Sequence, residues 1–411
     1  MLTVTDFTEQ ALVLQTLHEL RQDEIHLRTF SDVIDDAGYQ YVDLVMEGGG
    51  VLGIALVGYV YVLEQMGLRF LQLGGTSAGA INVMLLAAAG PIDAAKAEWT
   101  LDKLAAKDLH DFMDGDDDAR DLIDTALAGA SPLRLALRAI QVIDNLKEDQ
   151  GLNPGDNFRE WIRDLLAQCN VQSMADLRQV RAQTPPGLRH RDTNDAYPPE
   201  QFGRVALVAA DITTETKAVL PEMGELYWAD CDTLNPAELV RASMSIPLFF
   251  TPYRVTNVPQ GSQAWERWNR LAGYSGDVPS EVVFVDGGVM SNFPIDLFHN
   301  YHKVPSAPTF GARIGLSRNK PVNTTKLTQF LFAIFNSARH VHDYDFIARN
   351  PDYRNLVGVI DTGEHNWLDF GLSDAAKLDL FARGAQAAGT FLRRFNWQKY
   401  KELRAKMVGV Y

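Results

Sequence analysis

Three short segments of this 411-residue chain hold residue types that could transfer an acyl group. The first, GTSAG, fits the pattern G-x-S-x-G of a turn that presents a nucleophilic serine, here Ser77. The backbone of such a sharp strand-to-helix turn is strained, and Gly75 and Gly79 remove side chains that would collide with it. The helix that follows directs its N-terminus at Ser77, where it would stabilise developing negative charge.

The second segment, EGGGVLG, supplies backbone N–H groups. Gly48, Gly49 and Gly50 lie between an apolar strand and an apolar helix, and no side chain obstructs their N–H groups. Such donors form an oxyanion hole when they point at the oxygen of a tetrahedral intermediate. We expect this strand to lie beside the one that delivers Ser77, with both turns at the carboxyl edge of a parallel sheet. The two turns therefore predict an acyl-transfer site within one βαβ unit.

The third segment, VVFVDGG, offers a general base. Asp286 ends an apolar strand, and Gly287 and Gly288 clear space around its carboxylate. At the same sheet edge, partly removed from water, this carboxylate could accept the proton of a serine. Asp211 ends the strand RVALVAAD and competes for the role, but it lacks the two glycines. Asp286 is therefore the favoured base.

No histidine stands at a strand end or in a glycine-rich turn, so each is interpreted as a surface or core residue. The nine are His18, His26, His110, His190, His299, His302, His340, His342 and His365. We therefore expect catalysis to need Asp286 and no histidine.

A nucleotide-binding module is the alternative from another class of protein. Gly48, Gly50 and Gly53 match G-x-G-x-x-G in a turn after a strand, which is the dinucleotide-binding fingerprint. That fingerprint needs an acidic residue at the end of the second strand to hold the ribose hydroxyls. The second strand here ends in Leu73–Gly75, without an acid, and the serine motif takes its place. A third alternative is an inactive enzyme that serves as an interaction module.

The segments EGGGVLG, GTSAG and DGG, in this order, resemble the motifs of the patatin-like phospholipases. The connecting segments RASMSIPLFFTP and DGGVMSNFPIDLF are similar to bacterial members of that family. The resemblance covers roughly residues 41–320, and WLDFGLSDAAKLDLFARGAQAAGTFL resembles the family's C-terminal helical end.

This resemblance implies a three-layer α/β/α fold with a mainly parallel central sheet. It implies that Ser77 is the nucleophile, that Asp286 activates it and later the hydrolytic water, and that Gly48–Gly50 form the oxyanion hole. Such a carboxylic ester hydrolase is of phospholipase A or lysophospholipase type. It cleaves acyl ester bonds of lipids through an acyl-enzyme, without a cofactor or metal. Leu52 stands where many members carry Lys or Arg, so an esterase or neutral-lipid hydrolase of the same fold is the alternative.

The elements that must position these residues follow from the apolar pattern. Strand, helix, strand and helix alternate over residues 41–90, which predicts βαβ units and a parallel sheet. Residues 6–35 are expected to be helical, with capping-box spacing between Asp6 and Glu9. TFGARIGL is expected to be the last strand, with helices following at 325–348 and 373–395. The expected parts are an N-terminal helical arm (1–38), a catalytic domain (39–325) with a cap inserted at about 93–200, and a C-terminal helical region (326–411).

Composition narrows the class of partner and compartment. The net charge of −15 argues against nucleic acid as a partner. Two cysteines and the lack of a recognisable signal peptide favour the cytoplasm. No apolar run is long enough to cross a membrane, so we expect a protein that meets a lipid or membrane-surface substrate from outside the bilayer.

Two further stretches are weighed against simpler interpretations. The acidic run Asp111–Asp124 does not have the spacing of a calcium-binding EF-hand loop, and a solvated acidic face is favoured. The insertion at 257–280 offers Trp265, Trp268 and Tyr274 to a lipid interface, where amphipathic aromatic residues are common. Packing of the insertion itself explains these aromatic residues equally well.

Overall fold

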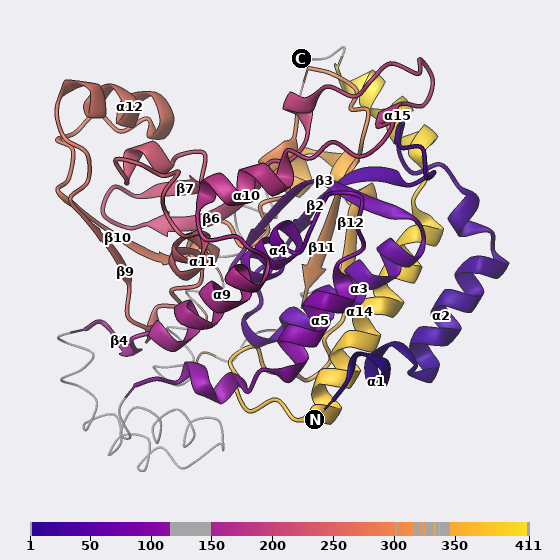
Figure 1. Ribbon diagram of the computed structural model, residues 1–411, viewed down its shortest axis with the longest axis horizontal. Helices are drawn as coiled ribbons and strands as arrows, with labels where there is room; N and C mark the ends of the chain where they lie inside the picture. The colour runs from indigo at the N-terminus through magenta and orange to yellow at the C-terminus, as the bar shows by residue number, and fades with distance from the viewer. Residues whose placement is uncertain are drawn as a thin grey trace.

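A ten-stranded sheet forms the centre of the described chain (Figure 1). The computed structural model describes residues 2–115, 149–300, 302–315 and 346–408, with the single positions 321, 324, 333 and 337. The strands on the main path of the sheet are, in spatial order, β12 (Val357–Ile360), β11 (Thr309–Ile314), β2 (Gln40–Met46), β3 (Leu68–Thr76), β6 (Val205–Asp211), β10 (Glu281–Asp286) and β9 (Tyr253–Thr256).

The five strands from β12 to β6 are parallel to one another, which confirms the mainly parallel sheet. Beyond them, β10 runs antiparallel to β6, and β9 runs antiparallel to β10. The remaining short strands are β7 (Thr216–Leu220), which forms a hairpin with β6, β1 (Val33–Ile34) and β5 (Arg189–His190) beside β2, and the separate pair β4 (Gly151–Asn153) and β8 (Leu248–Phe250).

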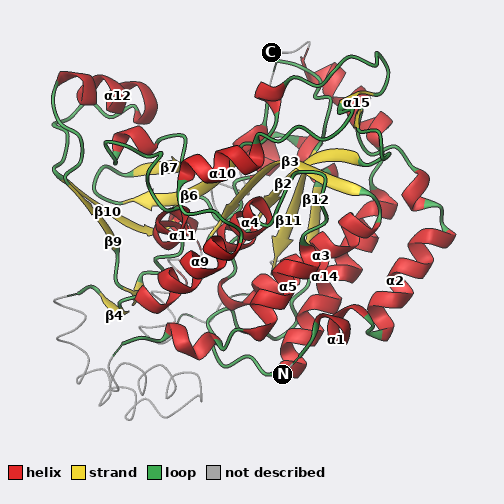
Figure 2. Ribbon diagram, viewed as in Figure 1, coloured by secondary structure: helices red, strands yellow, loops and turns green. Residues whose placement is uncertain are grey.

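Helices cover one face of this sheet, as Figure 2 shows. The two innermost, α3 and α4, are apolar and buried over almost their whole circumference, because the sheet lies on one side and further helices on the other. The helices are α1 (Val4–Thr8), α2 (Ala11–Gln22), α3 (Gly53–Gln65), α4 (Ala78–Ala88), α5 (Ala97–Ala106), α9 (Asp156–Gln168), α10 (Met174–Arg181), α11 (Pro236–Ser243), α12 (Ser262–Ala272), α14 (Asp374–Arg394) and α15 (Trp397–Val408).

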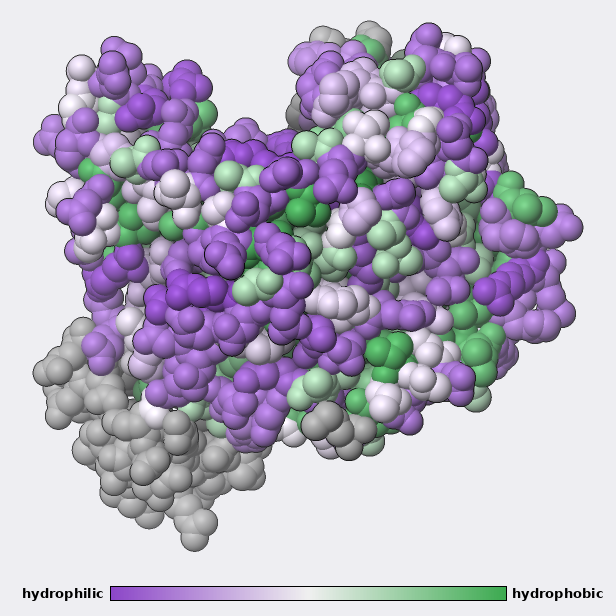
Figure 3. All heavy atoms as spheres, viewed as in Figure 1, coloured by the Kyte–Doolittle hydropathy of each residue, from purple (hydrophilic) through white to green (hydrophobic). Residues whose placement is uncertain are grey.

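The outer helices of this layer are amphipathic. α9 buries Phe158, Ile162, Leu165 and Leu166 and contacts α11 and α4, while its other face is polar. The face drawn in Figure 3 accordingly shows hydrophobic residues scattered among hydrophilic ones. The helices of the expected cap, α5, α9 and α10, all pack on α4 in this layer. The boundaries of the expected parts stay a prediction.

The opposite face of the sheet is covered, in the described residues, by 3₁₀ turns. One turn, η7 (Ile295–Phe298), packs on β2, β3 and β11, and a second, η8 (Pro351–Asn355), packs on α15. Glycine at positions 74 and 311 lets this layer approach, since an added Cβ at Gly74 would lie 2.7 Å from Leu297 Cδ1. The three-layer α/β/α arrangement expected from the sequence is therefore confirmed.

Three sequence-based expectations about the ends of the chain are wrong. Residues 6–35 do not form one helix: α1 ends at Thr8, α2 ends at Gln22, and the chain then reaches β1. The capping box joins Thr3 to Asp6 rather than Asp6 to Glu9. TFGARIGL forms β11, but the last strand is β12, which sequence analysis missed because VGVI is only four residues long. The expected helix at 373–395 is α14, while most of 325–348 lies outside the described residues.

The insertion at 257–280 folds on itself. Trp268 on α12 is fully buried and packs edge-to-face on Tyr227 and Tyr274, so its proposed exposure to lipid is wrong. Trp265, which is 43% exposed, remains on the surface. α12 contacts β7 and lies at the upper left of Figure 1. Over the described residues, no helix is both long enough and apolar enough to cross a bilayer.

The helices α3 and α14 cross at close range. A Cβ atom added to Gly384 would overlap the carbonyl oxygen of Ala55, and one added to Gly58 would overlap that of Phe381. Glycine on both helices therefore lets the two backbones touch. This contact joins α14 to α3, the helix that follows the glycine-rich loop.

We expect Gly384→Ala to lower the free energy of unfolding by about 1–3 kcal/mol, because its methyl group meets backbone that has no room to move. Gly389→Ala is the matched control on the same helix, since its added Cβ would meet only the end of the Thr16 side chain at 2.7 Å. Urea denaturation of the two variants measures the difference. Equal stabilities would show that the crossing is not tight.

Candidate active site

Ser77 lies in a strained turn between β3 and α4. Its φ of 54° and ψ of −120° are rarely adopted by a residue other than glycine. A Cβ at Gly79 would overlap the carbonyl oxygen of Met46, and one at Gly75 would lie 2.7 Å from the carbonyl carbon of Gly79. Both flanking glycines are thus sterically required, as the G-x-S-x-G pattern predicts. The turn places Ser77, only 2% exposed, at the N-terminus of α4.

The glycine-rich loop between β2 and α3 packs against this turn. A Cβ on Gly48 would lie 3.1 Å from Ser77 Cβ and 2.5 Å from Asn292 Oδ1, so position 48 has no room for a side chain. Gly50 has a φ of 53°, and a Cβ there would overlap the carbonyl oxygen of Trp367. The structure therefore brings the second expected segment into contact with the first.

The N–H groups of this loop are not equivalent. Gly48 donates its N–H to the carbonyl oxygen of Asn292 at 2.9 Å, so this group is already used. For the N–H groups of Gly49 and Gly50, no acceptor is found in the described part of the chain. The N–H of Ala78, in the first turn of α4, also has no helical partner. The expected oxyanion hole of Gly48, Gly49 and Gly50 stays a prediction, in which the N–H of Gly48 already has an acceptor, and the N–H of Ala78 is a candidate donor that sequence reasoning missed.

Asp286 reaches the site because two strands meet end to end on β6. β7 occupies one edge of β6, so β3 and β10 share the other edge. The last residue of β3, Thr76, pairs with Val208, and the last residue of β10, Asp286, pairs with the next residue, Ala209. Since the two strands run toward each other and end at adjacent residues of β6, the turn that holds Ser77 lies next to the turn after Asp286.

This meeting corrects one detail of the sequence analysis. Asp286 was expected at the same sheet edge on a strand like the others, whereas β10 approaches from the opposite direction. A Cβ on Gly287 would overlap the carbonyl oxygen of Val208 and lie 3.0 Å from Thr76 Cγ2. The glycine after Asp286 therefore lets the two strand ends approach closely, in addition to clearing space around the carboxylate.

The carboxylate of Asp286 is buried and oriented by the backbone. It is 2% exposed, and its Oδ1 accepts the N–H of Gly288 at 2.7 Å. Its own N–H donates to the carbonyl oxygen of Ser245 at 2.8 Å. The first bond orients the carboxylate and the second holds the backbone that carries it, as a positioned base requires.

The end of α11 holds both strand ends, and sequence reasoning missed this. Ser243 Oγ accepts the N–H of Ser77 at 3.1 Å and donates to the carbonyl oxygen of Val208 at 2.6 Å. Two residues later, Ser245 accepts from Asp286. Arg241 on the same helix donates to Ser245 Oγ at 2.6 Å, and burial lowers its pKa to about 10. The sequence contains these serines in the segment RASMSIP, but their role as hydrogen-bond partners of two strand ends cannot be inferred before the fold is known.

A second network holds the glycine-rich loop from the other side. Asn292 Nδ2 donates to Glu47 Oε1 at 3.2 Å and to the carbonyl oxygen of Gly48 at 3.1 Å. The other carboxylate oxygen of Glu47 accepts the N–H of Ile314 at 2.6 Å. Because Glu47 is only 1% exposed, these bonds replace the water it gives up on folding.

The comparisons with known proteins fit this geometry. The family model described as patatin-like phospholipase matches residues 44–299, which is more than half of the chain. The chain belongs to the patatin-like phospholipase family. Membership supports lipid hydrolysis as the class of activity.

Individual relatives are more distant. An uncharacterised protein of Bacillus subtilis, YqhO, is 29% identical over 359 residues, covering 87% of this chain and all of that protein. Among solved structures, VipD from Legionella pneumophila is 14% identical, with a TM-score of 0.43, over 89% of this chain and 70% of VipD. ExoU of Pseudomonas aeruginosa, in complex with SpcU, is 16% identical, with a TM-score of 0.37, over 86% of this chain and 52% of that one.

The competing carboxylate of the patatin-like site is engaged elsewhere. Asp211 pairs with Phe284, two steps along β6 from the strand junction. It accepts the N–H groups of Thr213 and Thr214, at 2.8 and 3.2 Å, and therefore caps the turn into β7. Burial raises the pKa of Asp211, against the effect of these hydrogen bonds.

Several histidines have partners on other elements. His365 bonds to Asp379 at 2.8 Å, and His190 contacts the ring of Tyr197. His299 packs on Tyr353, and burial lowers its pKa to about 4. His340 and His342 lie outside the described residues.

The first residues of the acidic run Asp111–Asp124 cap a helix and form an ion pair. Asp114 accepts the N–H groups of Gly155 and Asn157 at 2.8 and 2.9 Å, which caps the start of α9. Lys107 pairs with Asp111 at 2.7 Å. Residues 116–124 of the run lie outside the described part, and in that part no cluster of three potential metal ligands occurs.

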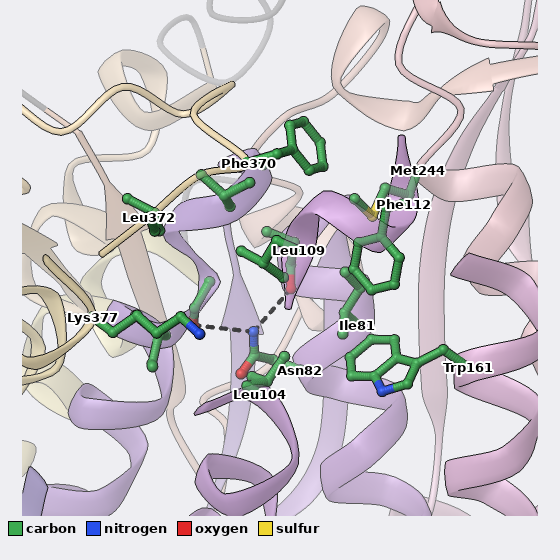
Figure 4. Close-up of a pocket in the computed structure, with 15 residues that line it drawn as sticks. Ile81, Asn82, Leu104, Leu109, Phe112, Trp161, Met244, Phe370, Leu372 and Lys377 are labelled. Carbon is green, nitrogen blue, oxygen red and sulfur yellow. Dashed lines mark hydrogen bonds between the residues drawn. The ribbon is translucent and has the colours of Figure 1, made fainter. Parts of the chain in front are cut away.

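An apolar pocket opens beside the turn of the patatin-like site (Figure 4). It begins at Gly50 and Ala78 and has a volume of about 40 Å³. Its other lining residues come from α3, α4, α5, α9, α14 and the segments between elements: Val51, Gly53, Ile54, Ile81, Asn82, Leu104, Leu109, Phe112, Trp161, Met244, Phe370, Leu372 and Lys377.

We expect Ser243→Ala to lower the free energy of unfolding by about 1–3 kcal/mol, because two buried backbone groups, Ser77 N–H and Val208 C=O, lose a partner. The control is Ser262→Ala at the exposed start of α12, where a change within about 0.5 kcal/mol is expected. Urea denaturation measures both. If Ser243→Ala were no less stable than the control, α11 would not hold the strand junction.

Proposed function

We propose that this protein is a serine acyl hydrolase that cleaves ester bonds of lipids, with Ser77 as nucleophile and Asp286 as general base. The observation that carries the proposal is the meeting of β3 and β10 at adjacent residues of β6. It brings a strained serine turn and a buried, oriented carboxylate to one point. The contact between Gly48 and Ser77 adds the glycine-rich loop to the same point.

The proposed reaction follows from the roles of these groups. Ser77 Oγ attacks the ester carbonyl carbon while its proton passes to the carboxylate of Asp286. The carbonyl oxygen becomes an oxyanion, which the N–H groups of Gly49, Gly50 and Ala78 would stabilise. Collapse of the tetrahedral intermediate breaks the ester bond, and the alcohol leaves with the proton from Asp286. Asp286 then takes a proton from water, whose oxygen attacks the acyl-enzyme. As the acyl–serine bond breaks, Asp286 gives this proton to Ser77 Oγ, which releases the fatty acid and restores both residues.

The environment of Leu52 favours a substrate that makes no phosphate contact at this position. Leu52 is 4% exposed and belongs to the main hydrophobic cluster. A basic side chain here would have to reach out of that cluster to meet a phosphate. A phospholipid headgroup would therefore be bound by other residues, and neutral acyl esters are the second candidate substrates for the same mechanism.

The nucleotide-binding alternative gains no support. β3 ends in Gly74, Gly75 and Thr76 with no acidic side chain, and the first of these is covered by Leu297 and Phe298. Gly53, the last glycine of the fingerprint, packs against Asn82 instead, whose Nδ2 would lie 3.1 Å from an added Cβ.

We expect Ser77→Ala to abolish hydrolysis of p-nitrophenyl butyrate and labelling by a fluorophosphonate probe. Asp286→Asn keeps the size of the side chain but removes the base, so its turnover should fall by about 10²–10⁴-fold. Melting temperatures show whether each variant is folded. Wild-type turnover in folded Ser77→Ala would end the proposal, and a wild-type protein that the probe does not label would instead be an inactive relative.

Asp211→Asn is the matched control for the carboxylate, because it alters the other buried strand-end aspartate at a position that caps a turn. Its turnover per folded molecule should stay within a few-fold of wild type. The same holds for Gln in place of His110, His299, His302, His340, His342 or His365, one at a time. A histidine variant as inactive as Asp286→Asn would replace the proposed dyad with a Ser-His-Asp triad.

A further inference from the structure

The apolar pocket lies where we expect the acyl chain of a bound ester to leave the active site. Gly50 and Ala78 both line it: Ala78 follows Ser77 in the chain, and Gly50 belongs to the loop that packs against the Ser77 turn. An ester whose carbonyl oxygen points at their N–H groups would have its carbonyl carbon at Ser77 Oγ. The first methylene of the acyl chain would then lie at this end of the pocket.

The interior of the pocket suits a hydrocarbon chain. The charged end of Lys377 is turned away, because Nζ donates to the carbonyl oxygens of Ala105 and Lys107 at 3.0 and 3.1 Å, which leaves only its stem in the lining. Asn82 Nδ2 is also occupied, since it donates to the carbonyl oxygens of Gly53 and Ala78 (Figure 4). Asn82 Oδ1 has no hydrogen-bond partner in the described part of the chain, so one polar atom of this side chain is unsatisfied. The rest of the lining is mostly aliphatic and aromatic.

The pocket is short. Along α4 it extends from Ala78 to Ile81 and Asn82, which is about one turn or roughly 5 Å. Its volume of about 40 Å³ has room for roughly three water molecules. A chain of a few carbons fits without movement of the walls, whereas the chain of a typical membrane lipid does not.

Trp161 forms the wall that separates the pocket from solvent on the α9 side. Its ring packs on Phe112, with centroids 5.2 Å apart, and on Phe158 at 6.3 Å. Unlike these two phenylalanines it is only half-buried, so the indole lines the pocket and is also partly exposed at the surface. Figure 4 shows the indole below Phe112 and beside Ile81.

We infer that this pocket binds the acyl chain and that Trp161 limits its length, so that the enzyme prefers esters of short-chain acids. This inference rests on the proposed function of Ser77. Trp161 is a specificity-determining residue in this scheme and takes no part in proton transfer. Removing the indole opens the pocket to solvent at its far side and lets a longer chain pass through.

The test compares kcat/KM for p-nitrophenyl butyrate and p-nitrophenyl dodecanoate, both below their aggregation limits. In the wild-type protein we expect a strong preference for butyrate. Trp161→Ala should raise the dodecanoate-to-butyrate ratio at least tenfold, since each further methylene that finds room in an apolar site is worth roughly fourfold. Leu109→Trp, at a half-buried lining residue, should fill the pocket and lower the ratio further. Trp265→Ala, on the remote α12, is the matched control and should keep the wild-type ratio.

The outcomes separate this inference from the proposed function. Opposite shifts by Trp161→Ala and Leu109→Trp support it. If wild-type hydrolysis depends on Ser77 but both variants keep the wild-type ratio, the acyl chain binds elsewhere and only this inference is overturned. If the wild-type protein shows no Ser77-dependent hydrolysis, the proposed function fails and this inference fails with it. Should Trp161→Ala not fold, the ratio for Leu109→Trp decides alone.

Discussion

The site depends on the sharing of one edge of β6 by two strands that run toward each other. β3 ends opposite Val208 and β10 ends opposite Ala209, so the two strands leave the edge of β6 at adjacent residues. Only glycine fits after Asp286, because any Cβ at Gly287 would overlap the carbonyl oxygen of Val208. The close approach that brings a serine and a carboxylate together is thus imposed by backbone pairing.

That junction has an energetic cost, which the surrounding polar groups offset. The backbone of Ser77 lies in a region that costs of order 1–3 kcal/mol for a residue other than glycine. The N–H of Ser77 has no partner in the described strands of the sheet, and it donates to Ser243 Oγ instead. The same hydroxyl donates to the carbonyl oxygen of Val208. The carbonyl oxygen of Ser245 accepts the N–H of Asp286. One helix end therefore satisfies the backbone groups that the junction removes from both strands.

Sequence reasoning succeeded where the rule is local. Ser77 and its flanking glycines follow from the sterics of one turn, and the structure shows those sterics at Gly75 and Gly79. It failed where the partner is distant in the chain. The N–H of Gly48 is used by Asn292, which is 244 residues away, and no local pattern reveals that bond. The direction of β10 was missed for the same reason, since an apolar strand looks alike in either orientation.

The site has a polar side and an apolar side, and the two sides have different roles in the proposed reaction. On the side of α11 and β10, buried hydrogen bonds hold the backbone of Ser77 and both the backbone and the carboxylate of Asp286. On the side of Gly50 and Ala78, the lining of the pocket is mostly aliphatic and aromatic. Proton transfer needs the first side to stay rigid, whereas the second side has only to exclude water and accept a chain. Side chains such as Trp161 can therefore change the size of the pocket without moving the residues proposed to carry the reaction, because the ring of Trp161 packs on Phe112 and Phe158 on the pocket side.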